Sequence, residues 1–350
     1  MILGAGASAP YGFPTAAALR KLILSLEVPN AGEIAVNFPV VDSNGSRHDR
    51  RTDPSVAEEK RGLRAQLDWR GFLDSTCEQA GCAKQLISDF RTTFFKARRT
   101  NIDKFIQRYE DDFGSLGRLH IAATILNCEY DALLDGDWYS QLFEEMIPND
   151  PEDVQQDRLS VITFNYDRSF ERFFTTALQY SFRLTSEQAL HVFHRIKLVH
   201  VYGALGTLGN MPYGKLEYVR EASEHISFIR NTCRPSCASD LERAIRGATN
   251  VCFIGFGFAP ENVSLFEPEW FANKNLIATS RGLSPNRMSE VQKKLKRIKF
   301  FDGTAVDLLN SHNIFESKRT AARVKHLPVR PRRSNFVRSV RLNPQESWTT

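Results

Sequence analysis

Glycines directly after an apolar run open the chain. Residues 4–8 read GAGAS and follow the apolar residues 1–3. Glycines at a strand-to-helix turn let the backbone approach a pyrophosphate, and the helix N-terminus offers free N–H groups to it. The third glycine of the dinucleotide-binding motif is replaced by Ala9. The stretch therefore indicates either nucleotide binding or a tight turn that uses glycine for its geometry.

Polar side chains follow a second apolar run. Residues 163–167 read TFNYD and end the run that begins at Leu159. Ligands of open α/β sheets bind outside the carboxyl ends of the strands. Asn165 and Asp167 are therefore candidates for function. The alternative is that one of them caps the next helix.

A histidine and a tyrosine stand at the end of a third run, residues 198–203 (LVHVYG). His200 and Tyr202 are two residues apart, so a strand would place both on one face. Either side chain could orient a ribose hydroxyl or accept its proton. A buried aromatic face is the alternative.

The fourth stretch is residues 254–258 (IGFGF), followed by Pro260, Glu261 and Asn262. A strand that ends in GxG allows close approach to a ribose or a base, and it could equally be a plain turn.

The elements that must position these residues form an alternating pattern. Short apolar runs predict strands at residues 1–3, 159–164, 196–202, 250–255, 276–279 and 298–301. Helices are predicted at 15–26, 166–178, 239–247 and 285–296. Such alternation is typical of a parallel sheet covered on both faces. We therefore expect an α/β fold with a Rossmann-like, doubly wound parallel sheet.

A helical subdomain is expected to interrupt this sheet. Apolar residues recur at spacings of three and four over about residues 56–147, as in Phe105, Tyr109 and Phe113. Residues 28–60 are polar and rich in turn formers, and residues 149–156 are expected to form a polar loop.

The composition is ordinary for a soluble globular protein, with 42% hydrophobic and 25% charged residues in 350. No apolar stretch approaches the roughly 20 residues of a membrane helix, and no secretory signal is visible. We expect a cytoplasmic protein without membrane contact. The six cysteines lack zinc-ribbon spacing, so free thiols and no metal are expected, and a four-thiolate site is the alternative.

Positive charge is concentrated at the C-terminal end. The net charge is +5, and residues 318–350 hold nine Lys or Arg against one acid, Glu346. The rest of the chain is therefore mildly acidic. We interpret residues 318–350 as a basic, flexible tail. Nucleic-acid contact through this tail is the alternative to a solvated tail without function.

In combination the four stretches are far more specific than any one of them. GAGAS with residues 12–15 (GFPT), then TFNYD, HVYG and GFGF with Asn262, resemble the sirtuin-like family. The resemblance is closer to the bacterial sirtuin-like NADases of antiphage defence. Residues 101–105 (NIDKF) are similar to a segment of their inserted helical region. The resemblance covers about residues 1–310, and we assign residues 1–317 to one sirtuin-like domain.

The resemblance implies an NAD site. Asn165 would place the attacking water beside the nicotinamide ribose, and Asp167 would face the carboxamide. With His200 they are the expected catalytic residues. The residues expected to bind NAD, which is the substrate, are Gly4, Ala5, Gly6, Ser8, Pro14, Thr15, Thr163, Tyr202, Gly203, Gly255, Gly257 and Asn262. Thr279, Ser280 and the turn at 302–303 would lie near the adenosine half.

Two features depart from the family pattern. Tyr202 occupies the position of the catalytic histidine, directly before Gly203, so His200 is a displaced candidate for that role. The site could also work without this base, or bind NAD without turnover. The second departure is a very short first strand, because only three residues precede Gly4. A truncated gene start would explain it.

The function expected from the resemblance is NAD⁺ hydrolysis to ADP-ribose and nicotinamide. Two alternatives remain: an NAD-dependent protein deacylase, disfavoured because CxxC pairs are missing, and a non-catalytic NAD- or ADP-ribose-sensing subunit. The resemblance also implies regulation by a homo-oligomer or by an activating protein partner.

Overall fold

The computed structural model describes residues 1–26, 58–99, 101–147, 150–151, 154, 158–228, 235–312 and 314–315. All of them belong to one compact unit, Met1–Phe315. The predicted basic tail, most of the polar stretch 28–60 and most of the predicted loop 149–156 lie outside the described residues.

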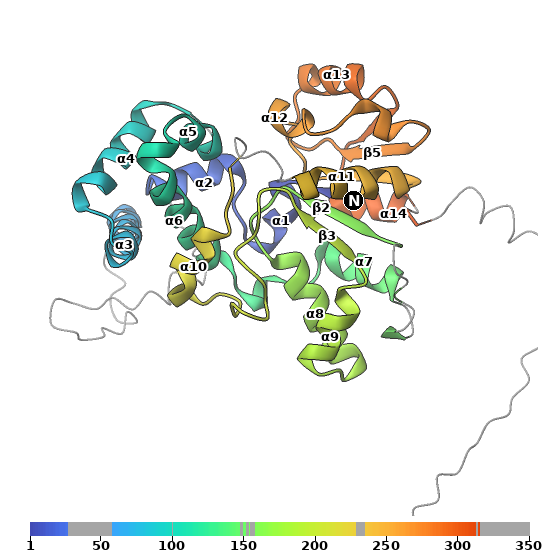
Figure 1. Ribbon diagram of the computed structural model, residues 1–350, viewed down its shortest axis with the longest axis horizontal. Coiled ribbons are helices and arrows are strands. Elements are labelled where there is room, and N and C mark those ends of the chain that lie inside the picture. Colours follow the sequence, from blue (N-terminus) through green and yellow to red (C-terminus); the bar gives the residue numbers. More distant parts are fainter. Residues whose placement is uncertain are drawn as a thin grey trace, which may run out of the picture. The chain divides into compact units, whose positions relative to one another are not determined.

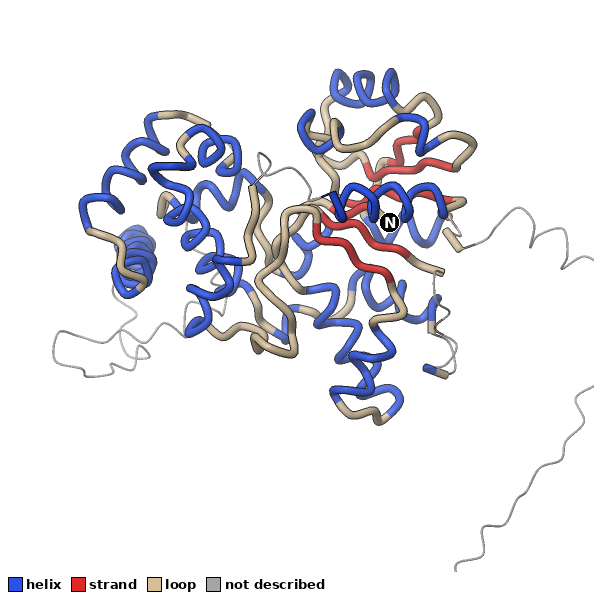
Figure 2. The backbone as a smooth tube through the Cα atoms, viewed as in Figure 1, coloured by secondary structure: helices blue, strands red, loops and turns tan. Residues whose placement is uncertain are grey.

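Six parallel strands form one sheet in the order β3-β2-β1-β4-β5-β6. Their bounds are Ile2–Leu3 (β1), Ser160–Thr163 (β2), Lys197–His200 (β3), Asn250–Ile254 (β4), Asn275–Thr279 (β5) and Ile298–Phe301 (β6). In register, Ile2 stands beside Ile162 on one side and Phe253 on the other. This strand order is that of a Rossmann-like, doubly wound sheet, so the predicted fold class is confirmed. Figure 2 shows the strands in red among the helices.

Helices connect the strands (Figure 1). α8 and α9 join β2 to β3, α11 joins β3 to β4, and α13 joins β5 to β6. Their bounds, with those of the remaining short helices in this part of the chain, are Ser169–Phe182 (α8), Ser186–Phe193 (α9), Leu216–Tyr218 (η5), Val219–Glu224 (α10), Pro235–Gly247 (α11), Pro260–Val263 (α12), Pro268–Phe271 (η7), Pro285–Lys294 (α13) and Ala305–Ser311 (α14).

A block of helices lies between β1 and β2, in the segment predicted to be helical. After α1 (Ala5–Ser8), η1 (Ala9–Tyr11) and α2 (Ala16–Ile23) come α3 (Glu58–Gln79), α4 (Lys84–Lys96), α5 (Ile102–Arg108), α6 (Glu110–Cys128), η3 (Asp131–Leu133) and α7 (Asp137–Met146). α6 is buried along most of its length because α2, α3, α4, α5 and α10 pack around it. An aromatic cluster that includes Phe90, Phe105 and Phe113 fills the space between them.

Two predicted boundaries near the polar stretches are wrong. α8 begins at Ser169 and not at Tyr166; its N-cap is Arg168, and the preceding Asp167 carboxylate accepts the Ser169 N–H. β3 ends at His200, because the chain turns there and the Gly203 N–H donates to the His200 carbonyl. His200 and Tyr202 therefore do not share the face of a strand.

Four cysteines, at positions 77, 82, 128 and 252, are free as predicted, whereas Cys237 is disulfide-bonded, so the prediction of a free thiol is wrong there. Among the described residues no cluster of three or more potential metal ligands occurs. Within the same residues, no helix combines the length and the apolar character needed to span a membrane.

Candidate functional site

The four polar or glycine-rich stretches meet at one edge of the sheet. All strands are parallel, so the segments that follow β1, β2, β3 and β4 emerge on the same side. The strand order reverses between β1 and β4, and ligands of such sheets bind at this switch point. The GAGAS and GFGF stretches flank it.

The two glycine stretches are in direct contact. Gly4 N–H donates to the Ile254 carbonyl and Gly6 N–H donates to the Gly255 carbonyl, each at 3.1 Å. Gly255 has a φ of +56°, and a Cβ at this position would lie 2.1 Å from the backbone nitrogen of Ala7. The close approach of the two loops therefore requires glycine. Gly6 and Gly257 are exposed at the surface of this contact.

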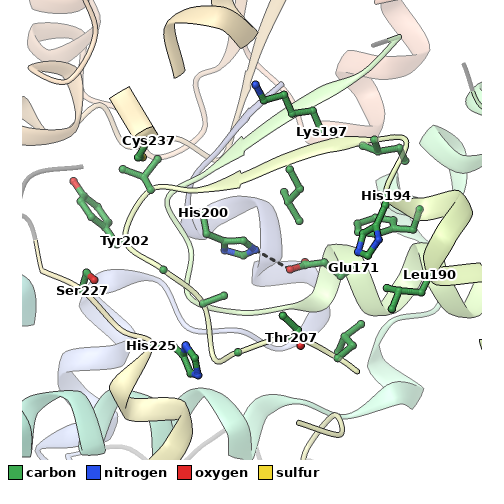
Figure 3. A pocket seen from close by; sticks show the side chains of 18 of the residues that line it. Glu171, Leu190, His194, Lys197, His200, Tyr202, Thr207, His225, Ser227 and Cys237 are labelled. Atoms are coloured by element: carbon green, nitrogen blue, oxygen red, sulfur yellow. Dashed lines mark hydrogen bonds and ion pairs between the residues drawn. The ribbon is translucent and has the colours of Figure 1, made fainter. Parts of the chain in front are cut away.

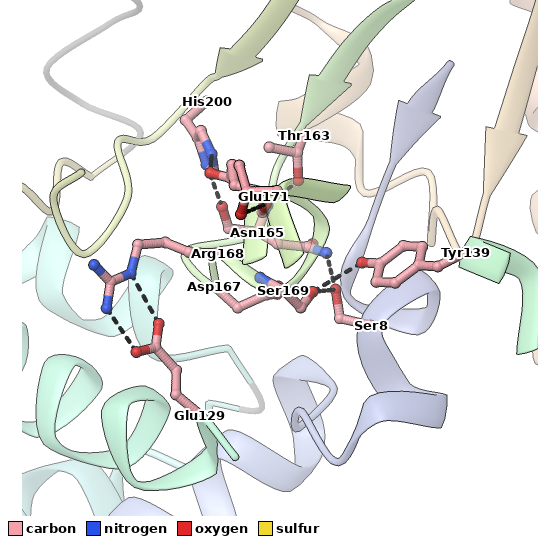
Figure 4. Close-up of polar contacts among 11 residues, drawn as sticks. Ser8, Glu129, Tyr139, Thr163, Asn165, Asp167, Arg168, Ser169, Glu171 and His200 are labelled. Carbon is pink, nitrogen blue, oxygen red and sulfur yellow. Dashed lines mark hydrogen bonds and ion pairs between the residues drawn. The ribbon is translucent and has the colours of Figure 1, made fainter. Parts of the chain in front are cut away.

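Asn165 is held beside the first glycine stretch (Figure 4). Its Nδ2 donates to the Gly4 carbonyl at 3.1 Å and to Ser8 Oγ at 3.0 Å. The side chain is buried, with 7% of the residue exposed. Its Oδ1 is buried and has no hydrogen-bond partner in the part of the chain that the structure describes. The amide is therefore fixed by its donors, and its buried acceptor is left without a partner among the described residues.

Asp167 occupies a buried hydrogen-bonded cluster next to Asn165. It accepts the backbone N–H of Ser169 at 3.1 Å and the Ser169 hydroxyl. Ser169 Oγ lies 2.8 Å from the Tyr139 hydroxyl and 3.5 Å from Ser8 Oγ. Burial raises the pKa of Asp167 above its ordinary value. Both of these hydrogen bonds come from Ser169, the first residue of α8, and contact with a carboxamide stays a prediction.

His200 joins Asn165 to α8. Its Nδ1 lies 3.1 Å from the Asn165 carbonyl oxygen, and its Nε2 lies 2.7 Å from Glu171 Oε1. Burial opposes protonation of the ring, but the Glu171 carboxylate and these hydrogen bonds outweigh it and raise the pKa of His200. Both ring nitrogens face oxygen acceptors, so an imidazolium that donates to both fits this geometry. In this arrangement His200 positions Asn165 and has no lone pair to accept a proton.

Tyr202 and Asn262, both expected at the NAD site, contact each other. The Tyr202 hydroxyl donates to Asn262 Oδ1 at 2.6 Å, and its buried ring packs edge-on against Phe164. This bond connects the segment after β3 with the segment after β4, across the switch point.

The helical block between β1 and β2 also contacts the segments that follow the strands. The Tyr166 hydroxyl donates to Asp103 Oδ1 at 2.7 Å, and Lys104 pairs with Glu261 at 3.1 Å. Burial raises the pKa of Asp103 to about 6. α5 of the helical block is thus bonded to the segments after both β2 and β4.

Not all predicted residues fall at the switch point. A cavity of about 860 Å³ lies beside β3, and its lining includes His200, Tyr202 and Gly203 but neither Asn165 nor the glycine stretches. Figure 3 shows His200 and Glu171 joined in its wall. Thr15 Oγ1 accepts the Ala18 N–H, so Thr15 caps α2 directly after Pro14. Thr279 and Ser280 lie at the end of β5, and the turn at 302–303 follows β6. The remaining predicted residues lie along the edge formed by β1, β2 and β4.

Several residues of the site were not predicted from the sequence. Glu171 falls within the helix predicted at 166–178, directly after TFNYD, and this was the available signal. Tyr139 and Ser169 carry no local signal, because their contact depends on how α7 packs on α8.

No protein-family model matches the chain, and no curated protein matches it either.

Proposed function

We propose that this chain binds NAD⁺ at the carboxyl edge of its sheet and hydrolyses the nicotinamide–ribose bond, in the manner of sirtuin-like NADases. The Rossmann-like strand order and the contact between two glycine stretches at the switch point support dinucleotide binding. The observation that carries the proposal is Asn165, whose donors are fixed and whose buried Oδ1 is left to a ligand. A role in antiphage defence, with an activating partner or self-association, belongs to the same proposal.

The chemistry requires few catalytic groups. Nicotinamide leaves NAD⁺ as a neutral molecule without prior protonation, and the transition state resembles an oxocarbenium ion. Asn165 Oδ1 accepts a hydrogen bond from a water and holds it for attack at the ribose carbon. The water oxygen forms the new C–O bond, the C–N bond breaks, and the water proton passes to solvent. His200 acts through the Asn165 backbone, which it holds.

A second candidate is a non-catalytic subunit that senses NAD or ADP-ribose. The specific observation that favours it is that the side chains of both candidates for the catalytic base, His200 and Tyr202, are already engaged in hydrogen bonds. His200 has both ring nitrogens engaged, and the Tyr202 hydroxyl is bonded to Asn262.

Replacement of Asn165 tests the proposal. We expect the full chain to release nicotinamide from NAD⁺, and Asn165→Ala to slow this release about 100-fold or more, because one preorganised polar group is lost. Release is measured by liquid chromatography, with circular dichroism to verify folding. Asn286→Ala, at an exposed position on α13, is the matched control and should retain full activity.

The alternatives give different results in the same samples. Unchanged turnover in Asn165→Ala would show that the site is assigned wrongly. Saturable NAD⁺ binding by calorimetry without turnover would favour the sensing subunit. Formation of O-acetyl-ADP-ribose from an acetylated peptide would instead identify a deacylase.

A further inference from the structure

The cavity beside β3 is separate from the glycine stretches. Its walls come from α8, α9 and α11, from β3, from the loop 201–208 and from the segment 225–228. Its volume of about 860 Å³ lies within the range of small-molecule binding sites, roughly 300–1,000 Å³. The cavity is thus large enough for an organic ligand.

The apolar part of the lining fits an apolar or aromatic body. Leu190 and Phe193 line it from α9, and Leu208 and Phe228 line it from the loops. Such walls, with a few polar groups among them, are typical of ligand sites.

The polar part of the lining is rich in hydrogen-bond donors. It includes Lys197, His194 and His225, with the hydroxyls of Thr207 and Ser227. The Lys197 ammonium is paired with Asp240 at 3.0 Å, so its charge is offset and the histidines and hydroxyls are the donors that face the cavity. Among the described residues that line the cavity, the only carboxylate is Glu171, and it is bonded to His200. The lining offers more donors than acceptors and its carboxylate is already bonded, so the complementary ligand is rich in hydrogen-bond acceptors, as an organic anion is.

We propose that this cavity binds a small organic anion with an apolar body, at a site distinct from the NAD edge. The occupant would contact the Glu171–His200 pair, which holds the Asn165 carbonyl. Binding there would regulate turnover by shifting Asn165, and this regulatory part rests on the proposed function.

Fluorescence of 8-anilinonaphthalene-1-sulfonate, an anionic aromatic probe, tests binding without any need for turnover. The full chain should give a saturable signal. The double variant His194→Glu/His225→Glu should bind about tenfold or more weakly, because like charges now face the probe. The matched control Asn286→Glu/Gln292→Glu adds the same charge on exposed positions of α13 and should bind as the wild type does.

Leu208→Trp fills the cavity without a change in charge and should also weaken probe binding, with thermal unfolding recorded to verify folding. Equal binding by the wild type and by both cavity variants would overturn the proposal. Displacement of the probe by NAD⁺ would overturn it too, because the cavity would then belong to the NAD edge.

Displacement by phenyl phosphate or by phenylacetate identifies which anionic group the cavity prefers, and displacement by neither overturns the proposal. The regulatory part is measured separately. The displacing anion should change nicotinamide release about twofold or more in the wild type and not in the double variant. If the anion binds but nicotinamide release does not change, the regulatory part of the proposal is wrong and the anion site itself is retained.

Discussion

At the scale of single residues, His200 shows how a buried histidine can hold a neighbouring backbone carbonyl in place. Its two nitrogens are occupied by a backbone carbonyl and a carboxylate. The raised pKa follows from Glu171, which outweighs the cost of burying the charged ring. The charge of His200 is thereby used to fix the backbone of Asn165.

Glu171→Gln should lower the pKa of His200, because burial then acts against the charged ring without a carboxylate to oppose it. Titration of the imidazole resonances by NMR measures this change. Glu187→Gln, at an exposed position on α9, is the control and should leave the titration unaltered.

The same substitution should alter stability in a pH-dependent way. Since the folded pKa of His200 is raised, its contribution to stability is fully present below the unfolded value of about 6.5 and is lost as the pH rises through the folded pKa. Glu171→Gln should therefore destabilise more at about pH 5.5 than at about pH 9, measured by urea unfolding. Equal losses at both would contradict the pair as described.

At the scale of elements, the turn after β1 and the turn after β4 act as one unit. The Gly4 and Gly6 N–H groups donate to carbonyls at the end of β4, and Gly255 N–H donates at 3.0 Å to Oγ1 of Thr279, the last residue of β5. Three neighbouring strand ends are thus bonded in a row. A ligand at the switch point would meet a surface whose shape is set by backbone.

Gly255→Ala should disrupt this unit, whereas Gly257→Ala should not. A Cβ added at Gly255 would clash with the Ala7 nitrogen, and the alanine would have to keep the positive φ of Gly255. A Cβ added at Gly257 would have no atom within 4 Å. We expect Gly255→Ala to lower the free energy of unfolding by about 2 kcal/mol or more. Urea unfolding of both variants measures this difference, and similar stability in the two would argue against the close contact.

At the scale of the whole compact unit, one buried ion pair joins the helical block to the sheet. Arg168, before α8, contacts both carboxylate oxygens of Glu129, at the end of α6, at 2.6 and 2.9 Å. Both side chains are 1% exposed or less. Arg168 also donates to the Met211 carbonyl, and Gly214 N–H donates to Glu129. Three distant segments meet at this pair.

Arg168→Met should lower the free energy of unfolding by about 3–5 kcal/mol, because it leaves a buried carboxylate without its partner. The double variant Arg168→Met/Glu129→Leu should recover part of the loss, since the unpaired charge is then removed. Chemical unfolding followed by circular dichroism compares the two. A single variant as stable as the wild type would refute a structural role for the pair.

The sequence predicted the sheet well because buried parallel strands are short, continuous apolar runs. It did not reveal α10 and α12, short helices of six and four residues whose signals are weak. α9 was missed although Thr185 and Gln188 form a capping box at its start. That local signal was present in the sequence.

For the candidate site, the sequence predicted that the four stretches follow strands and so meet at one edge of the sheet, but it did not predict the contacts between them. Asn165, Gly4 and Gly255 could be placed because each follows an apolar run. The Arg168–Glu129 pair spans 39 residues without any local pattern. The contacts of His200 depend on where β3 ends, which packing decides and propensity does not.

The indole of Trp138 gives the proposed dinucleotide site an optical reporter. Its Nε1–H donates at 2.9 Å to the carbonyl of Ala7, within the GAGAS stretch, and the ring is fully buried. A ligand that pulls on this backbone alters the electrostatic field at the indole. The wavelength of maximum tryptophan fluorescence should therefore shift when a ligand binds the GAGAS stretch. Stopped-flow fluorescence can follow this shift on the millisecond scale without a label.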